Sequence, residues 1–132
     1  RQRLGDLRDL IARRFDEGAV VSVGPDDTLM TAFQRMRLAE VSQLPVLDKN
    51  KLLGVIDESD LLLTVHDDAA RFHSPVSGAM TTKLDTVRPD ASLDTLRAIL
   101  DRGLVAIIAD DKQFYGLVTR FDLLNHLRKK LT

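Results

Sequence analysis

Few side chains in this sequence have the types and spacing that catalysis needs. The three histidines are His66, His73 and His126, and none is followed by a histidine or a carboxylate at the third or fourth residue along. We expect them to be exposed, at helix ends and in a loop. The chain has no cysteine, which excludes a thiol nucleophile, a disulfide and a thiolate metal site. There is no glycine-rich phosphate loop either. The sequence therefore predicts no catalytic residue and no metal ligand, and we expect that this chain is not an enzyme by itself.

One short segment does combine groups that can bind a ligand. Residues 116–122 read GLVTRFD, where a strand should end at Val118 and a helix should begin at about Arg120. Thr119 then stands at the helix N-cap and Asp122 in the first turn. The unpaired N–H groups and the helix dipole at such a site favour an anion such as phosphate, and the carboxylate can accept hydrogen bonds from both hydroxyls of a ribose. The same two residues would also form an ordinary capping box with the backbone, so both interpretations stay open.

The elements that must position this segment occur twice along the chain. Residues 23–26, VGPD, reappear 64 residues later as VRPD, and residues 54–62, GVIDESDLL, reappear 62 residues later as GLVTRFDLL. Each repeat should begin with a short strand, at 19–23 and at 84–87. The Pro-Asp pair ends this strand and offers an aspartate as the N-cap of the next helix.

The rest of each repeat reads as a helix, a hairpin and a closing helix. The first helix is predicted from apolar residues that recur at helical spacing. These are Leu29, Ala32, Phe33 and Met36 in one repeat, and Leu93, Leu96, Ile99 and Leu100 in the other. Two apolar runs joined by a polar turn then predict a hairpin. The runs are 44–47 with 52–56, and 105–109 with 114–118; the closing helices are 58–66 and 120–131.

The predicted fold class is therefore α+β, with a β-α-β-β-α unit used twice. We expect a linker helix at 1–18, marked by Leu7, Leu10, Ile11 and Phe15, a first repeat at 19–66, a crossover segment at 67–80 and a second repeat at 81–132. A repeat of roughly 60 residues is marginal alone. We therefore expect the two to pack as one body related by a pseudo-twofold axis.

Composition limits the classes of function. The 132 residues are 44% hydrophobic and 30% charged with a net charge of −1, and no basic stripe predicts nucleic-acid or membrane-surface binding. No apolar run reaches the ~20 residues of a membrane span, and no secretory signal is present, which favours a cytoplasmic protein. Because the chain opens at Arg1 without a methionine, we interpret it as a piece of a longer protein.

The doubled pattern resembles the CBS-domain pair, or Bateman module. The matching residues are the two Val-x-Pro-Asp starts, Leu44-Pro45-Val46 with Asp48, the two Gly-to-Asp-Leu-Leu ends, and residues 77–81, SGAMT. Residues 7–14, LRDLIARR, with 41–46, VSQLPV, and 116–125, GLVTRFDLLN, are similar to the C-terminal regulatory domain of bacterial cystathionine β-synthases. That closer resemblance implies a pyridoxal-phosphate catalytic domain, absent from this fragment, which the module controls.

The resemblance also implies two clefts for adenosine ligands between the repeats, in which the Thr-x-x-Asp segment binds ribose and phosphate. The first cleft would be formed by Ala19, Val20, Val21, Val41, Ser42, Gln43, Thr119, Phe121 and Asp122. The second would be formed by Asp57, Ser59, Asp60, Leu84, Asp85, Thr86, Leu104 and Val105.

The second cleft departs from the family pattern, since Asp57 stands where the family often has Thr or Ser, and Asp85 adds another negative charge. Like charges 4 Å apart repel by about 4 kcal/mol at an effective dielectric constant near 20, so Asp57 should disfavour a phosphate. We expect one functional cleft, at Asp122, and a weak or empty one at Asp60.

Three functions remain open at this stage. The first is a regulatory module that binds S-adenosylmethionine, AMP or ATP. The second is a ligand-insensitive structural module that forms homodimers, for which Leu123, Leu124, Leu127 and Leu131 on the last helix could supply a face; these leucines could equally be ordinary core. The third is a free-standing sensor of AMP or ATP, against which the segment at 7–14 argues.

Overall fold

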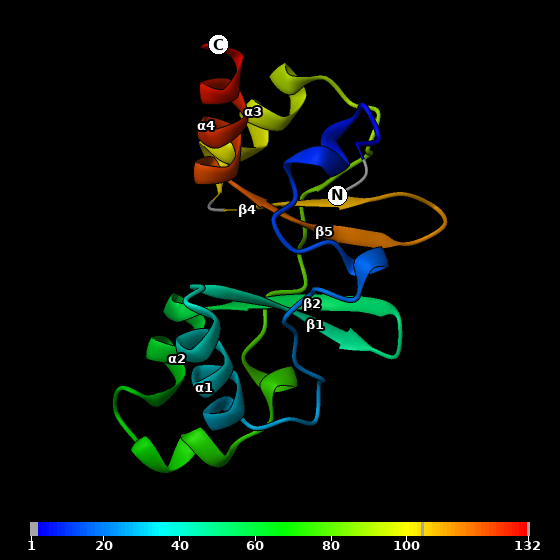
Figure 1. Ribbon diagram of the computed structural model, residues 1–132. Coiled ribbons are helices and arrows are strands. Elements are labelled where there is room, and N and C mark those ends of the chain that lie inside the picture. The colour runs from blue at the N-terminus through cyan, green and yellow to red at the C-terminus, as the bar shows by residue number, and fades with distance from the viewer. Residues whose placement is uncertain (1–2, 104, 132) are drawn as a thin grey trace. The chain divides into compact units, whose positions relative to one another are not determined.

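The computed structural model describes residues 3–103 and 105–131, which divide into two compact units. The first-repeat unit comprises Val21–Leu84. The second-repeat unit comprises Asp85–Thr132 together with the N-terminal Arg1–Val20. Both are small α+β units in which helices cover one face of a sheet (Figure 1).

The first-repeat unit contains the predicted helix, hairpin and closing helix. α1 spans Leu29–Ala39, β1 spans Gln43–Asp48, β2 spans Lys51–Asp57 and α2 spans Glu58–Val65. β1 and β2 pair antiparallel, with Leu44 opposite Ile56 and Val46 opposite Gly54. Its core includes buried residues from every one of these elements: Val23, Leu29, Ala32, Met36, Leu44, Val46, Ile56, Leu61 and Val76.

The second-repeat unit has the same order of elements. β3 spans Thr86–Val87, α3 spans Leu93–Arg102, β4 spans Val105–Ala109, β5 spans Phe114–Thr119 and α4 spans Arg120–Arg128, followed by a 3-10 turn at Lys129–Leu131. The β4–β5 hairpin pairs Ile108 with Gly116, which is the register of Val46 with Gly54 shifted by 62 residues. Both hairpins also have a bulge directly after this pair. The repeat seen in the sequence is thus a structural repeat as well.

The predicted first strands are shorter than expected, and Pro45 explains the difference. Val23 forms a single parallel bridge to β1, donating its N–H to Pro45 O and accepting from Leu47 N–H. The next bond of this parallel ladder would need an N–H from Pro45, which proline lacks. In the second repeat Ile107 occupies the equivalent place and does donate, to Asp85 O, so that β3 reaches two residues.

Two other expectations about helix starts and the N-terminus need correction. The N-caps of α1 and α3 are the hydroxyls of Thr28 and Ser92, each accepting from the N–H three residues later, and not the aspartates of the Pro-Asp pairs. Those pairs lie in the turns before the helices. The expected N-terminal linker helix is instead two short 3-10 helices, Leu7–Leu10 and Phe15–Glu17.

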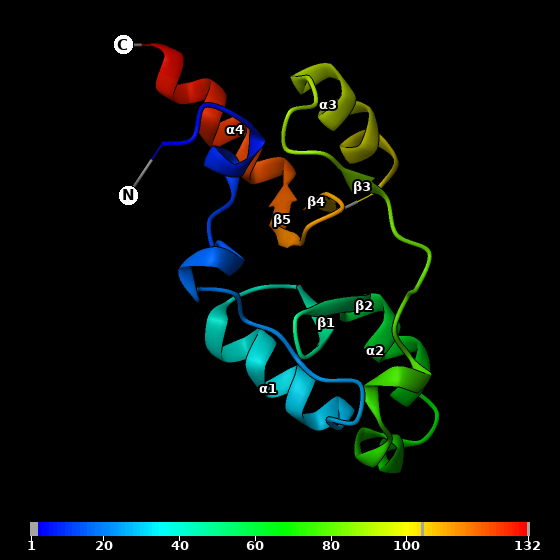
Figure 2. The same cartoon turned by 90° about the vertical axis from the view of Figure 1, so that its right-hand side faces the viewer.

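The N-terminal segment combines 3-10 backbone hydrogen bonds, such as Asp9 N–H to Asp6 O, with backbone N–H groups that donate to the carboxylates of Asp6 and Asp9. Leu7, Leu10 and Ile11 lie in the core of the second-repeat unit with residues of α3, β4 and β5. The segment lies beside α4 (Figure 2). Residues 67–80 form two 3-10 helices, Ala69–His73 and Val76–Gly78, and Thr81 then pairs with Val55 at the edge of β2.

Candidate functional site

The Thr119–Asp122 segment forms the capping box that the sequence allowed. The Thr119 side chain caps α4 by accepting from Asp122 N–H at 3.3 Å, and Thr119 N–H donates to Asp122 Oδ2 at 2.8 Å. The Thr119 hydroxyl is also 3.0 Å from Oδ2 and donates to it. All of these carboxylate bonds use Oδ2, so among the described residues Oδ1 of Asp122 is the oxygen left to accept from a ligand.

The equivalent segment of the first repeat is a capping box made of two carboxylates. Asp57 caps α2 by accepting from Asp60 N–H at 2.8 Å, and Asp60 Oδ2 accepts from Asp57 N–H at 3.0 Å. The other carboxylate oxygen of Asp60, Oδ1, accepts a hydrogen bond from the Thr81 hydroxyl at 3.3 Å. Burial raises the pKa of Asp60, and the nearby charge of Asp57 raises it further. Both oxygens of Asp60 therefore have protein partners, unlike those of Asp122.

Within each unit, the structure brings together residues that were assigned to different clefts. In the first-repeat unit Gln43 pairs with Asp57, and Ser42 O accepts from Glu58 N–H, so the turn before β1 meets the start of α2. In the second-repeat unit Val105 pairs with Thr119. The start of α2 in the first repeat and the start of α4 in the second thus have the same local geometry, but different residues form them.

The remaining predicted residues divide between the units. Val21, Val41, Ser42, Gln43, Asp57, Ser59, Asp60 and Leu84 belong to the first-repeat unit. Ala19, Val20, Asp85, Thr86, Val105, Thr119, Phe121 and Asp122 belong to the second-repeat unit. Leu104 lies outside the described residues. Because each predicted cleft draws on both units, the grouping of these residues into two clefts stays a prediction.

A pocket that the sequence did not predict lies against Asp122 within the second-repeat unit. It has a volume of about 420 Å3, and we name it the α4 pocket. One wall is formed by Asp122, Asn125, His126 and Lys129, which lie three or four residues apart on one face of α4 and the turn after it. The other wall is the N-terminal segment. Its lining residues are Arg3, Asp9, Leu10, Ile11, Ala12, Arg14, Asp122, Asn125, His126 and Lys129. The signal was present in the sequence, since Asp122 precedes His126 by four residues and the two share a helix face.

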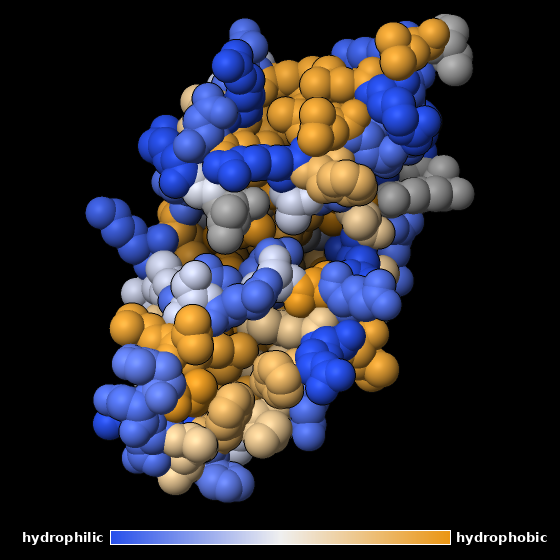
Figure 3. All heavy atoms as spheres, turned by 90° about the vertical axis from the view of Figure 1, so that its left-hand side faces the viewer, coloured by the Kyte–Doolittle hydropathy of each residue, from blue (hydrophilic) through white to orange (hydrophobic). Residues whose placement is uncertain are grey.

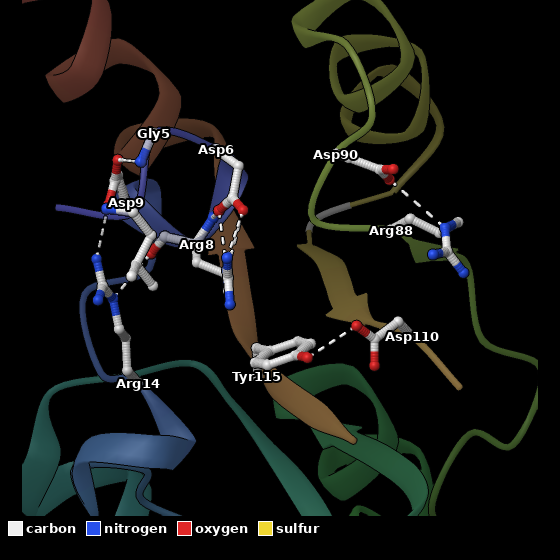
Figure 4. Close-up of polar contacts among 10 residues, drawn as sticks. Gly5, Asp6, Arg8, Asp9, Arg14, Arg88, Asp90, Asp110 and Tyr115 are labelled. Atoms are coloured by element: carbon white, nitrogen blue, oxygen red, sulfur yellow. Dashed lines mark hydrogen bonds and ion pairs between the residues drawn. The ribbon is translucent and has the colours of Figure 1, made fainter. Parts of the chain in front are cut away.

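Buried polar groups hold the N-terminal wall of this pocket in place. Arg14 is only 3% exposed; its guanidinium donates to Asp9 Oδ1 at 2.8 Å and to Arg8 O at 3.0 Å. Asp9 also accepts from the N–H groups of Leu4 and Gly5, each at 2.8 Å (Figure 4). Burial acts to raise the pKa of Asp9, but these hydrogen bonds and the charge of Arg14 outweigh it and lower the pKa.

A second set of polar contacts ties the same segment to the hairpin of the second repeat. Arg8 forms an ion pair with Asp6 at 2.6 Å, and its guanidinium lies 5.3 Å from the centre of the Tyr115 ring. The Tyr115 hydroxyl donates to Asp110 Oδ2 at 2.7 Å (Figure 4). This hydrogen bond is the main reason that the pKa of Asp110 is lowered and that of Tyr115 is raised.

An apolar groove lies within the first-repeat unit, between α1, α2 and Ala69–His73. We name it the α1–α2 groove; its volume is about 510 Å3. It is lined by Phe33, Met36, Arg37, Val41, Glu58, Ser59, Leu61, Leu62, Val65 and Phe72. The Phe33 and Phe72 rings meet edge to face with their centres 5.9 Å apart. Two predicted site residues, Val41 and Ser59, contribute to its walls.

Over residues 3–103 and 105–131, no group of three or more His, Cys, Asp or Glu side chains could hold a metal ion. In the same ranges no helix is long and apolar enough to cross a membrane.

The fold and the two capped helix starts define a tandem-repeat α+β module in which each β-α-β-β-α repeat ends in the same type of site. The sequence model of the CBS domain matches residues 7–67 and again residues 76–129, so the chain belongs to the CBS domain family. The resemblance to a CBS pair is confirmed.

Relatives and solved structures agree with this assignment. The chain is 26% identical over 106 residues to the CBS domain-containing protein YhcV of Bacillus subtilis, covering 79% of this chain and 76% of that protein. It is 33% identical over 109 residues to the glycine betaine/carnitine/choline transport ATP-binding protein OpuCA of Bacillus subtilis, covering 80% of this chain but only 27% of the transporter subunit. The crystal structure of CBSX2 in complex with AMP shares the fold, with a TM-score of 0.80 at 21% identity over 96% of this chain and 98% of that one.

These matches are to CBS proteins in general. They do not support the closer resemblance to the C-terminal domain of cystathionine β-synthases.

Proposed function

We propose that this chain is a non-catalytic regulatory module that binds one adenosine-containing ligand at the Thr119–Asp122 site. The observation that carries the proposal is the difference between the two capping boxes. Asp122 uses only Oδ2 for its cap, so that Oδ1 can accept from a ribose, whereas both oxygens of Asp60 already have protein partners. Binding of AMP by CBSX2, which has the same fold, supports an adenosine ligand for this chain.

The proposed cleft would be completed by the predicted residues of the first repeat, Val21 and Val41 with Ser42 and Gln43, and by Ala19 and Val20. Apolar members would pack on adenine while backbone groups recognise its edge. Phe121, which is 79% exposed beside Asp122, offers an aromatic face to such a ligand. The second cleft would be weak or empty, because the charges of Asp57 and Asp85 would repel a phosphate.

Calorimetric titration with AMP, ATP and S-adenosylmethionine tests this proposal. We expect one ligand per chain. Asp122→Asn keeps an oxygen for the cap but removes the charge; a hydrogen bond to a charged group is worth about 1.5–3 kcal/mol, so binding should weaken tenfold or more. Asp60→Asn is the matched control and should leave the affinity unchanged. Two equal sites, or no effect of Asp122→Asn, would contradict the proposal.

A finer form of the proposal places the module in the cytoplasm, attached to a pyridoxal-phosphate-dependent catalytic domain of the cystathionine β-synthase type, with S-adenosylmethionine as its effector. Its support is the sequence resemblance of residues 7–14 and 116–125. Purifying the protein with its natural full-length chain tests this form. A bound pyridoxal phosphate would support it, and a full-length chain with no catalytic domain would contradict it.

A second candidate function, self-association, is favoured by apolar side chains on the surface. Leu124, Leu127 and Leu131 are 61%, 45% and 85% exposed, so the last helix does not bury these three leucines in its own core. Figure 3 shows hydrophobic side chains gathered on the face that carries α4. A homodimer through this face, or through the α1–α2 groove, would cover them.

Sedimentation of wild type and Leu124→Arg tests self-association. If α4 supplies the interface, we expect a dimer that the substitution converts to a monomer. A wild-type monomer at high concentration would remove this candidate and leave the ligand proposal standing.

A further inference from the structure

One hydroxyl group distinguishes the Asp60 site from the equivalent site at Asp122. In both sites Oδ2 of the aspartate accepts from the backbone N–H three residues earlier, as part of the helix cap. At Asp60 the second oxygen, Oδ1, also accepts from the Thr81 hydroxyl at 3.3 Å. An ionised carboxylate can only accept, so the hydroxyl must be the donor. Thr81 therefore makes the bond to Asp60 that a ribose hydroxyl would make at Asp122.

Backbone pairing at the edge of β2 fixes the position of Thr81. Its N–H donates to Val55 O at 2.8 Å, and its carbonyl accepts from Val55 N–H at 2.9 Å. Gly54 leaves room for this pairing, since an added Cβ there would lie 2.7 Å from Thr81 O. The hydroxyl is thus presented to Asp60 by main-chain contacts. Substitutions that change only the side chain of Thr81 should leave these contacts intact.

The hydrogen bond between Thr81 and Asp60 lies where a ligand could replace it. Thr81 is exposed and Asp60 is half-buried. A nucleoside that bonds to Oδ1 must first displace the Thr81 hydroxyl. The hydroxyl has the advantage in this competition, because a donor held in the same chain acts at a high effective concentration, whereas a free ligand loses translational and rotational freedom on binding.

The charge of Asp57 limits what the site could bind if the hydroxyl were removed. Asp57 is the N-cap of α2, and its Oδ1 accepts from Asp60 N–H at 2.8 Å. In the second repeat this place belongs to Thr119, which is neutral. The charge of Asp57 repels a phosphate but not a ribose hydroxyl, which is uncharged. The chemistry of the Asp60 site therefore fits a nucleoside without a phosphate.

We propose that Thr81 occupies the position of a ribose hydroxyl at Asp60 and so closes this site to nucleosides. The second adenosine site of the module is then closed by one side chain, and removing the Thr81 hydroxyl should open it to adenosine but not to AMP. This inference rests on the proposed function for the class of ligand. The closing contact itself lies within the first-repeat unit and does not involve Asp122.

The experiment compares Thr81→Ala with Thr81→Ser, two variants that both lose the methyl group and differ only in the hydroxyl. Each is combined with Asp122→Asn, so that the Asp60 site is observed without the stronger site. Calorimetric titrations use adenosine and AMP. We expect Thr81→Ala to bind adenosine about tenfold more tightly than Thr81→Ser, as for one hydrogen bond to a charged group. AMP should show no such gain, and adding Asp60→Asn to Thr81→Ala should remove it.

A second measurement tests the contact itself. Burial raises the pKa of Asp60, and the hydrogen bond from Thr81 acts in the opposite direction. An NMR titration of the Asp60 carboxyl group should therefore give a higher pKa in Thr81→Ala than in Thr81→Ser. Equal pKa values in the two variants would show that the hydroxyl does not bond to Asp60, and would overturn the inference.

The outcomes also separate this inference from the proposed function. If Asp122→Asn alone weakens adenosine binding but Thr81→Ala and Thr81→Ser bind equally, the inference is wrong and the proposed function stands. If Thr81→Ala opens a site that depends on Asp60 while Asp122→Asn alone has no effect, the inference stands and the proposed function is wrong. A gain for AMP as large as that for adenosine, or a gain that survives Asp60→Asn, would overturn the inference. Binding by none of the variants, wild type included, would overturn both.

Discussion

Asp60 and Asp122 occupy equivalent places in the two repeats, and replacing each by asparagine should change stability in opposite directions. Asparagine keeps the shape of aspartate and an oxygen that can accept from the N-cap N–H. In Asp60→Asn the amide nitrogen can face the Thr81 hydroxyl, so the hydrogen bonds at both former carboxylate oxygens survive. What the substitution removes is a negative charge beside that of Asp57.

The expected gain for Asp60→Asn is about 0.5 kcal/mol at pH 7. Neighbouring like charges on an exposed helix destabilise by roughly 0.2–0.5 kcal/mol, and solvent screens this partly exposed pair. Asp122→Asn should instead lose about 0.5–1 kcal/mol. Its partner Thr119 is neutral, so the substitution removes only favourable interactions of the carboxylate with the helix N-terminus and with its donors.

The stability gain of Asp60→Asn should depend on pH, and the direction of that dependence tests the reasoning. Because the pKa of Asp60 is raised in the folded protein, the protonated form is favoured by folding. The protonated Asp60 therefore contributes to the stability of the fold below the unfolded-state pKa, and this contribution is lost as the pH rises through the folded-state pKa. Asparagine resembles the protonated acid at every pH, so the gain should be full at pH 7 and should vanish near pH 3.

Urea denaturation of wild type and both variants at pH 7 and pH 3 measures these differences from the transition midpoints. The reasoning would be refuted if Asp60→Asn were destabilising at pH 7, if its gain did not shrink in acid, or if Asp122→Asn gained as much.

Two further substitutions test how the N-terminal segment packs in the second-repeat unit. Gly116→Ala should destabilise by about 2 kcal/mol or more, because its Cβ would lie 2.5 Å from Ile11 Cγ2 and its φ of +154° is strained for other residues; Gly78→Ala, whose Cβ meets nothing within 4 Å, is the control for thermal unfolding. Arg14→Met should cost about 3 kcal/mol, because it leaves the charge of Asp9 without its buried partner. A loss under 1 kcal/mol in urea denaturation would show that this ion pair is dispensable.

Much of the fold could be predicted from the sequence because both repeats carry the same local signals. The apolar spacing of α1 and α3, the polar turns of the hairpins and the Thr-x-x-Asp cap of α4 each depend on neighbours within a few residues. The shortness of the first strand could not be read from its own residues. It follows from Pro45, about 20 residues away, which withholds one ladder hydrogen bond from the partner strand.

The candidate site, like the fold, could be predicted only where it depends on residues close together in the sequence. The capping boxes depend on residues three apart, and the sequence shows both. The α4 pocket depends on contacts between the N-terminal segment and residues more than 100 positions later, which no local pattern encodes. Even so, the spacing of Asp122, His126 and Lys129 on one helix face was visible.

The two units are built in the same way, and this explains why the N-terminal segment packs with the second repeat. Each CBS match begins before the first strand of its repeat, at residue 7 and at residue 76, and so includes a lead-in segment. The lead-in of the second repeat passes over Gly54 on β2, where an added Cβ would lie 2.7 Å from Thr81 O. The lead-in of the first repeat passes over Gly116 on β5 in the same way.

Each lead-in therefore packs on the hairpin of the other repeat, and the glycine that begins each Gly-to-Asp-Leu-Leu motif gives it room. Ile11 in one lead-in and Val76 in the other are fully buried in those cores. Neither unit is then built from one repeat alone, since residues 7–11 complete the core around α3 and β5.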